Sequence, residues 1–280
     1  MPFPRVVNHH KPDRRSVPNG YGIFYVLFSV CYWFVLVFLG IRDTEALSLA
    51  TSVLFGSTMG LFDDMANLRW RYKAVLPVFA ALPYMVLRPS GRTTITTFLA
   101  GSVDLGALFF LLLVPIIVTV VTNSYNQLGG LNGLEAGSGL IVIFALTLVS
   151  RDWILLAVPT LVLAALTYLS FTGKAFIGNV GSFSVGLTLA VVAILNNLKL
   201  MLFISFLPFM GNSILILWSN YVLRDRAMTL IDQDGRLYAN KIRSLRTLLL
   251  HYKHMTERET VIAMYFLLAF FALIAALLTY

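Results

Sequence analysis

The sequence predicts an all-α integral membrane protein, a single domain over residues 1–280 with about nine transmembrane helices. Three observations support this fold class. The chain is 58% hydrophobic and only 12% charged, and its mean hydropathy is +0.81, well above that of ordinary soluble domains. The apolar residues are gathered in long runs that polar loops separate. The Lys and Arg residues are concentrated in alternate loops, as is typical of proteins that cross a bilayer.

Each expected helix corresponds to one apolar run. A helix needs about 20 apolar residues to cross the hydrocarbon core, and the runs that approach this length cover residues 21–40, 44–61, 74–88, 105–121, 136–150, 153–170, 183–197, 199–219 and 261–280. The third and fourth runs contain prolines, namely Pro77, Pro83 and Pro115. Neighbouring helices can satisfy the backbone groups that prolines free, so we expect these runs to span as well. Residues 1–20 have no apolar core and are expected to form a cytosolic arm.

The basic residues predict how the chain is oriented. With nine alternating spans, 16 of the 21 Lys and Arg residues fall on the side of the N-terminus. The other side holds the remaining five, which are Arg42, Arg88, Arg92, Arg151 and Lys199. The positive-inside rule therefore places the N-terminus in the cytosol and the C-terminus outside. The net charge of +8 is mostly this topology signal, and it does not indicate a nucleic-acid partner.

Two carboxylates end the second run, in the stretch LFDDMANLRWRYK. A carboxylate at the membrane edge is costly and usually has a function. Asp63 and Asp64 are neighbours, and neighbouring side chains on a helix point about 100° apart. We therefore expect two roles, in which one aspartate binds a metal or acts as a base and the other orients a cation such as Lys73. The alternative is a solvated helix end that balances the basic residues after it.

The loop TNSYNQLGGLNGLE at 122–135 combines amides with glycines. Glycine lets the backbone approach a ligand closely, and amide groups bind bases or hard cations. The candidate residues here are Asn123, Asn126, Gly130, Asn132 and Glu135. Because glycine and asparagine are also common loop formers, a purely structural loop is the alternative.

The loop GKAFIGNVGS at 173–182 directly precedes an apolar run. We expect free N–H groups of a helix N-terminus to face a cytosolic cavity there, since such ends bind phosphate. Phe176 is expected to stack on a planar base, with an anchor at the membrane surface as the alternative. Asn179 stands where a metal and phosphate site would favour a carboxylate. Asn179 is therefore either a lost catalytic group, a substitute for the carboxylate or a sign of another function.

The segment 220–260 is expected to be a cytosolic loop with two parts. Arg224 and Arg226, in RDRAMTLIDQDGRL, are guanidinium groups suited to a diphosphate. The stretch KIRSLRTLLLHYKH at 241–254 predicts an amphipathic helix on the membrane surface. Its apolar stripe is Ile242, Leu245, Leu248, Leu249 and Tyr252.

These loops together resemble the polyprenyl-phosphate N-acetylhexosamine-1-phosphate transferases, which load a sugar phosphate onto a lipid carrier in the membrane. GLFDDMANLRWRYKAVLP is similar to the double-aspartate motif of that family, TNSYNQLGGLNGLEAG to its Asn-rich nucleotide loop and FIGNVGSFSVG to its Gly-Asp motif. The three motifs occur in the family's order through most of the chain. NGLEAG, and RDR followed by DGRL, resemble the archaeal and eukaryotic dolichyl-phosphate GlcNAc-1-phosphotransferases.

The resemblance implies transfer of GlcNAc-1-phosphate from UDP-GlcNAc to a polyprenyl (dolichyl) phosphate, the first step of lipid-linked oligosaccharide synthesis for N-glycosylation. It also implies Mg²⁺, or alternatively Mn²⁺, and an active site that faces the cytosol from the cell membrane, or from the ER membrane in a eukaryote. The expected partners are these substrates, membrane lipid and, as an open alternative, a second copy of the chain. The catalytic candidates are Asp63, Asp64 and Lys73, the metal candidates Asn126 and Asn179, and the substrate-binding candidates Asn123, Gly130, Asn132, Glu135, Phe176, Arg224 and Arg226.

The chain departs from the family pattern at several positions. The N-terminal arm stands in place of the family's usual first span, Asn19 replaces a Glu of the eukaryotic relatives, and Asp225 replaces the middle His of an Arg-His-Arg triplet. Asn179 replaces the aspartate of the Gly-Asp motif. The nearer alternative is a transferase for another UDP-HexNAc. Asn179 motivates a second alternative, an inactive membrane protein that binds or transports lipid or nucleotide sugar.

Overall fold

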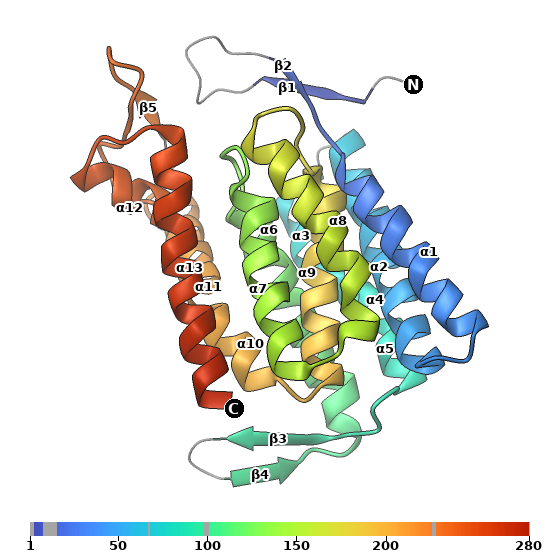
Figure 1. Cartoon of the computed structure of the whole chain (residues 1–280). Helices are drawn as coiled ribbons and strands as arrows, with labels where there is room; N and C mark the ends of the chain where they lie inside the picture. Colours follow the sequence, from blue (N-terminus) through green and yellow to red (C-terminus); the bar gives the residue numbers. More distant parts are fainter. Residues whose placement is uncertain (1–2, 8–15, 67, 98–100, 226–227, 280) are drawn as a thin grey trace.

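Long helices packed side by side form the body of the molecule in the computed structural model, which describes residues 3–7, 16–66, 68–97, 101–225 and 228–279 (Figure 1). The helices are α1 (Gly22–Phe38), α2 (Asp43–Ala66), α3 (Trp70–Val75), α4 (Pro77–Ala80), α5 (Leu82–Leu87), the π-helical turn η1 (Phe109–Leu113), α6 (Val114–Gln127), α7 (Leu134–Ser150), α8 (Trp153–Phe171), α9 (Gly178–Leu195), α10 (Lys199–Ser205), α11 (Leu207–Tyr221), α12 (Leu245–Tyr252) and α13 (Glu257–Thr279).

Three short antiparallel strand pairs lie outside the bundle and were not predicted. They are β1 (Arg5–Val7) with β2 (Ser16–Pro18), β3 (Thr94–Thr97) with β4 (Gly101–Asp104), and β5 (Leu230–Ile231) with β6 (Leu237–Tyr238). The first pair includes part of the expected N-terminal arm, and the second follows the polar stretch after α5. The all-α prediction therefore holds for the bundle but not for its polar connections.

Five helical stretches of the described chain are long and apolar enough to cross a membrane: α2, η1 with α6, α8, α9 and α13. A sixth is formed if α10 and α11, bent by 53° at their junction, make one span, while α1 and α7 are apolar but shorter. The run at 74–88 is divided into α3, α4 and α5. Pro77 and Pro83 are in the first turns of α4 and α5, where the missing N–H of proline is tolerated but a preceding helix is interrupted.

The two ends of the bundle differ in their loops (Figure 1). The N-terminal end carries β1–β2, the α6–α7 loop, the α8–α9 loop and α12, whereas the C-terminal end carries β3–β4 and the C-terminus. The five basic residues that were predicted on the side opposite the N-terminus lie in loops at the C-terminal end. Arg42 there forms an ion pair with Asp152, with 3.4 Å between Nη2 and Oδ2, and Lys199 lies 5.2 Å from the centre of the Phe109 ring. The predicted polar loops therefore share the opposite end.

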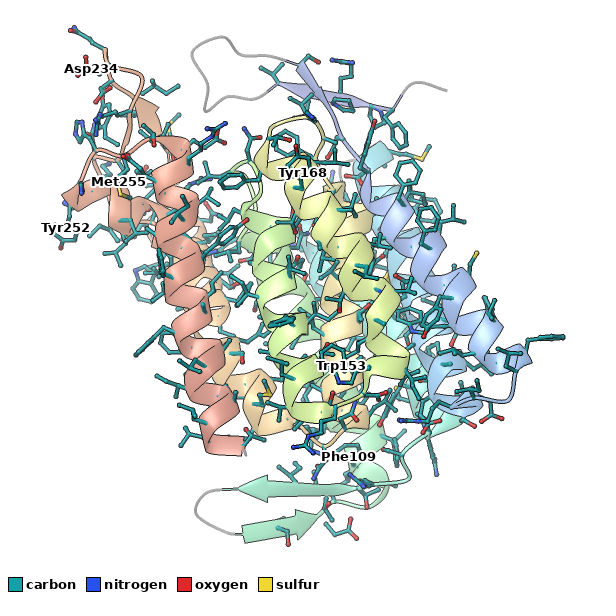
Figure 2. The ribbon with its side chains drawn as sticks, in the orientation of Figure 1. Phe109, Trp153, Tyr168, Asp234, Tyr252 and Met255 are labelled. Atoms are coloured by element: carbon teal, nitrogen blue, oxygen red, sulfur yellow. The ribbon has the colours of Figure 1, made fainter. Side chains whose placement is uncertain are left out.

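The outer helices expose large apolar side chains, as lipid-facing helices do. On α1 and α13 the exposed side chains include Phe38, Phe266 and Phe270. Figure 2 shows Trp153 and Tyr168 near opposite ends of α8, and both rings are at least half exposed. Their spacing of 15 positions corresponds to roughly 22 Å along a helix, and aromatic rings favour the two membrane interfaces. The protein is an integral membrane protein whose bundle is all-α.

Helix α9 is the centre of the bundle. Every residue from Val180 to Leu195 is buried, which agrees with a helix that is apolar on all sides. Helix α2 packs directly against its first turn. A Cβ at Gly60 would lie 2.5 Å from the carbonyl oxygen of Asn179, so only glycine allows the two backbones to touch there. Asp64 lies one turn after Gly60 and is thereby brought to the start of α9.

Helix α12 differs from the predicted amphipathic helix in its length and in its buried face. It covers 245–252 rather than 241–254, because Ser244 and Thr247 form a capping box that starts the helix. Ser244, Thr247 and Leu250 are buried, in contact with neighbouring elements of the chain. Tyr252, from the predicted stripe, is 78% exposed and points away from the body in Figure 2. The contact with the membrane surface stays a prediction.

Candidate active site

Two cavities at the N-terminal end of the bundle share a wall. The smaller, of about 380 Å³, is lined by Val6, Val7, Asn19, Asp64, Asn126, Gly129, Gly130, Glu135, Phe176, Gly178 and Asn179. The larger, of about 630 Å³, lies between α3, α6 and α11 and is lined in part by Lys73, Asn123, Asn126 and Asn179. Asn126 and Asn179 line both cavities. The predicted loops from three distant parts of the sequence therefore meet at one site.

Asp64 caps the first turn of α9. Its Oδ1 accepts hydrogen bonds from the backbone N–H and from Nδ2 of Asn179, both at 3.0 Å, and its Oδ2 accepts one from the N–H of Val180 at 3.0 Å. Asn19 Nδ2 approaches the same Oδ1 at 3.5 Å. The expectation of free N–H groups for phosphate at this helix start is therefore wrong, because a carboxylate of the chain already accepts two of them.

Asp63 faces a different neighbour. Its Oδ1 accepts the N–H of Leu68 at 2.9 Å, and its Oδ2 lies 2.7 Å from Nζ of Lys73. The Asp63 side chain is 1% exposed and the Lys73 side chain 27%, so the ion pair is largely shielded from water. The two aspartates therefore occupy different environments, one beside Lys73 and the other beside Asn179.

The amides of Asn126 and Asn179 fit a hard cation when a charged ligand is added. Among the described residues, no group of three or more His, Cys, Asp or Glu side chains is placed to hold a metal. Asn179 directs its Nδ2 at Asp64, which leaves its carbonyl oxygen as the ligating atom. Two amide oxygens and the Asp64 carboxylate are oxygen donors of the kind Mg²⁺ takes, usually together with phosphate oxygens.

The glycine-rich loop between α6 and α7 lines the smaller cavity. Gly130 has a φ of +105°, which favours glycine. Glu135 is half-buried and accepts a short hydrogen bond from the Ser182 hydroxyl, and its carboxyl lies 3.1 Å from the Cβ that a side chain at position 129 would have. Gly130 and Glu135 therefore both line the smaller cavity, and their contact with a substrate stays a prediction.

Asn132 is held by a residue that the sequence patterns did not identify. Its backbone N–H donates to Oε1 of Glu257 at 2.8 Å, and its Nδ2 donates to Oε2 of Glu257 at 2.9 Å. Asn132 is 4% exposed and does not line either cavity. Glu257 is in the first turn of α13, where a carboxylate is also expected for a helix start. The sequence around Glu257 does not distinguish a residue that binds a distant loop from one that only caps its own helix.

The other candidates are divided between the site and the surface. Phe176 lines the smaller cavity, and its N–H donates to the Pro18 carbonyl at 2.9 Å. Asn123 lines the larger cavity and donates from Nδ2 to the Thr119 carbonyl at 3.0 Å. Arg224 is exposed after α11 and lines neither cavity. Arg226 lies outside the described residues.

Carboxylates, amides and a lysine that meet at the edge of a membrane bundle define a membrane enzyme that acts on charged substrates. The sequence profile described as glycosyl transferase family 4 matches residues 46–197, which is more than half of the chain. The chain belongs to that family, and the resemblance that the loops suggested is confirmed.

Relatives from three groups of organisms resemble this chain. A UDP-N-acetylglucosamine–dolichyl-phosphate N-acetylglucosaminephosphotransferase of Dictyostelium discoideum is 28% identical over 240 residues, covering 69% of this chain and 59% of the relative. A protein of Saccharolobus solfataricus provisionally given the same name is 28% identical over 280 residues, covering 96% and 86%. A phospho-N-acetylmuramoyl-pentapeptide-transferase of Geobacillus kaustophilus is 27% identical over 215 residues, covering 70% and 66%.

Proposed function

We propose that this protein is an enzyme that transfers GlcNAc-1-phosphate from UDP-GlcNAc to a polyprenyl (dolichyl) phosphate. The observation that carries the proposal is the meeting of the three family loops at two joined cavities, with Asn126 and Asn179 in the shared wall. A phosphate oxygen of the lipid attacks the β-phosphorus of the donor. The new P–O bond gives polyprenyl-diphosphate-GlcNAc, and cleavage of the bond to the bridging oxygen releases UMP.

The two cavities suit the two substrates. The larger cavity has an apolar wall, formed by Val120, Met210, Ile214, Ile216 and Leu217, next to Lys73, so it suits a prenyl chain with its phosphate against the ammonium group. The smaller cavity has Phe176 and the glycine turn for the uridine. The donor diphosphate then lies between them, near Asn126 and Asn179.

Charge neutralisation is the main requirement of this reaction, since the lipid phosphate must approach a diphosphate. Lys73 binds the attacking phosphate, and Asp63 fixes the lysine through their 2.7 Å ion pair. Asp64 orients the Asn179 amide through Nδ2. Mg²⁺, or Mn²⁺, held by Asn126 and Asn179 would supply positive charge next to the diphosphate.

A topology of nine spans with a cytosolic active site completes the proposal. The long stretches, the bent α10–α11 pair, α1 and α7 account for eight spans, and the broken α3–α5 segment is the ninth. The two ends of the chain lie at opposite ends of the bundle (Figure 1), which agrees with an odd number of membrane spans. Sixteen basic residues on the side of the site favour the cytosol for that side. The membrane is then the cell membrane, or the ER membrane in a eukaryotic cell.

Release of UMP by the purified protein tests the function. We expect release from UDP-GlcNAc that depends on both dolichyl phosphate and Mg²⁺ and is stopped by a chelator. A panel of UDP-sugars and prenyl phosphates identifies the preferred pair. No release with any combination would contradict the transferase and favour the binding or transport alternative, which the amide at Asn179 motivates. That alternative predicts nucleotide-sugar binding without turnover at every Mg²⁺ concentration.

Replacing Glu257 with glutamine is expected to raise the Kd for UMP about 10-fold. A glutamine amide offers one acceptor oxygen instead of two, so one donor of Asn132 loses its partner and the loop that lines the smaller cavity is held less firmly. Calorimetric titration with UMP measures the change. The matched control is Glu259→Gln, two residues away, whose Oε2 only caps the Thr256 N–H at 2.8 Å. Equal affinities of wild type and Glu257→Gln would show that the loop does not depend on this contact.

A further inference from the structure

Arg246, on α12, is a guanidinium group without a partner. Among the residues that the structure describes, no hydrogen bond or ion pair involves it, and its Nε atom is buried with no acceptor. The side chain as a whole is half-buried. A shielded guanidinium that lacks hydrogen bonds is unfavourable unless a ligand supplies them.

The guanidinium lies directly behind the glycine turn of the candidate site. A Cβ at position 130 would lie 3.0 Å from Nη1 of Arg246, so the guanidinium lies against Gly130, which lines the smaller cavity. On its other side Arg246 lines a third cavity of about 240 Å³, together with Gln127, Asn220 and Gly129. Gly129 also lines the smaller cavity. Arg246 therefore lies at the junction of two hollows that share this turn.

The nearby acidic group, Glu257, forms no direct ion pair with Arg246 among the contacts of the described residues. Burial lowers the pKa of the guanidinium, and the charge of Glu257 acts in the opposite direction. Both oxygens of Glu257 already accept hydrogen bonds from Asn132. Arg243, three positions earlier, also has a buried Nε without an acceptor, but its guanidinium has a carboxylate partner. Its Nη2 lies 3.3 Å from Oδ2 of Asp225, and a hydrogen bond from Lys241 holds the pKa of the Asp225 carboxyl below its usual range. Arg246 thus has no direct carboxylate partner among the described residues, although the charge of Glu257 acts on it from nearby.

We propose that Arg246 binds the diphosphate of the nucleotide-sugar donor across the Gly129–Gly130 turn, an assignment that rests on the proposed function. The fork of a guanidinium matches phosphate oxygens with two parallel hydrogen bonds. The sequence patterns favoured Arg224 and Arg226 for this contact. Arg224 is exposed and lines neither cavity, and Arg226 lies outside the described residues. Arg246 is assigned to the donor because its Nη1 lies against Gly130, which lines the same cavity as Phe176. The hollow that Arg246 lines also shares Gln127, Ile216 and Asn220 with the larger cavity, which agrees with a diphosphate that lies between the two cavities.

Calorimetric titration of the full-length protein with uridine, UDP and UDP-GlcNAc tests the assignment. We expect Arg246→Gln to weaken the binding of UDP and UDP-GlcNAc about 10- to 100-fold, as loss of a charged bidentate contact does. The affinity for uridine should stay within about twofold of wild type. Arg246→Lys keeps the charge without the fork and is expected to weaken UDP less. It also provides the measurement if the glutamine variant does not fold.

Arg243→Gln is the matched control, since it removes a neighbouring arginine that Asp225 already pairs, and UDP affinity should stay within about twofold. Unchanged UDP affinity in both Arg246 variants would overturn the assignment, as would an equal loss for uridine and UDP, which would mean that Arg246 only supports the loop. Selective loss of dolichyl phosphate binding would assign it to the acceptor and overturn it as well. If wild type binds no uridine nucleotide, the proposed function itself fails and the assignment with it.

Discussion

Lys73→Ala is expected to lower the rate of UMP release about 100- to 1,000-fold and to destabilise the protein. The rate falls because the attacking phosphate loses its fixed cation. The stability falls because Asp63, whose side chain is 1% exposed, is left with an unpaired charge. Breaking a fully buried pair costs about 3–5 kcal/mol. The 27% exposure of Lys73 reduces this to roughly 2–3 kcal/mol. Turnover and thermal melting in detergent measure the two effects.

A double variant separates catalysis from stability at this pair. Asp63→Asn with Lys73→Met removes both charges, so the melting temperature should recover most of the loss, since a neutral pair can replace a buried ion pair with little penalty. Turnover should stay low. Arg71→Ala, two positions from Lys73 and exposed, is the control and should change both measurements little. Near-normal turnover in Lys73→Ala would show that the lysine is structural.

The order and chemistry of the loops could be predicted because each motif is local in the sequence. Asp64, Asn126, Gly130 and Phe176 lie in short polar motifs that needed only a shared end of the bundle to meet. Their partners could not be predicted in the same way. The caps that Asp64 provides to Asn179 and Val180 depend on the close approach of α2 and α9 at Gly60, which no pattern in either helix specifies.

The features that could not be predicted from the sequence depend on contacts between residues that are far apart in the chain. Glu257 follows Asn132 by 125 positions, and nothing but the folded chain connects them. The bounds of α12 were predicted too long, and the burial of Thr247 and Leu250 against the protein depends on neighbouring elements that the apolar stripe does not specify. Hydropathy identified the apolar runs, but it did not reveal that Pro77 and Pro83 divide one of them.

Asn179→Asp is expected to strengthen Mg²⁺ binding to the nucleotide-free protein about 10- to 100-fold. Nδ2 of Asn179 donates to Asp64 Oδ1 at 3.0 Å, so an aspartate there would place a second carboxylate against the first. Without metal the two charges repel, and the lost hydrogen bond adds to the penalty, so the melting temperature should fall. A divalent cation that ligates both carboxylates removes the repulsion, so Mg²⁺ should raise the melting temperature of the variant more than that of wild type.

The same experiment decides why wild type functions with an amide at this position. The ligands Asn126 and Asn179 are uncharged, and the carboxylates among the described residues that line the smaller cavity are Asp64 and Glu135. We therefore expect wild type to bind Mg²⁺ weakly alone and much more tightly with UDP-GlcNAc, whose diphosphate supplies the missing charge. Calorimetry of Mg²⁺ with and without nucleotide measures this coupling. Asn220→Asp, which adds a carboxylate to the larger cavity on α11, is the control and should not strengthen binding. Strong Mg²⁺ binding by nucleotide-free wild type would contradict the coupling, and activity that appears only in Asn179→Asp would instead identify Asn179 as a lost ligand.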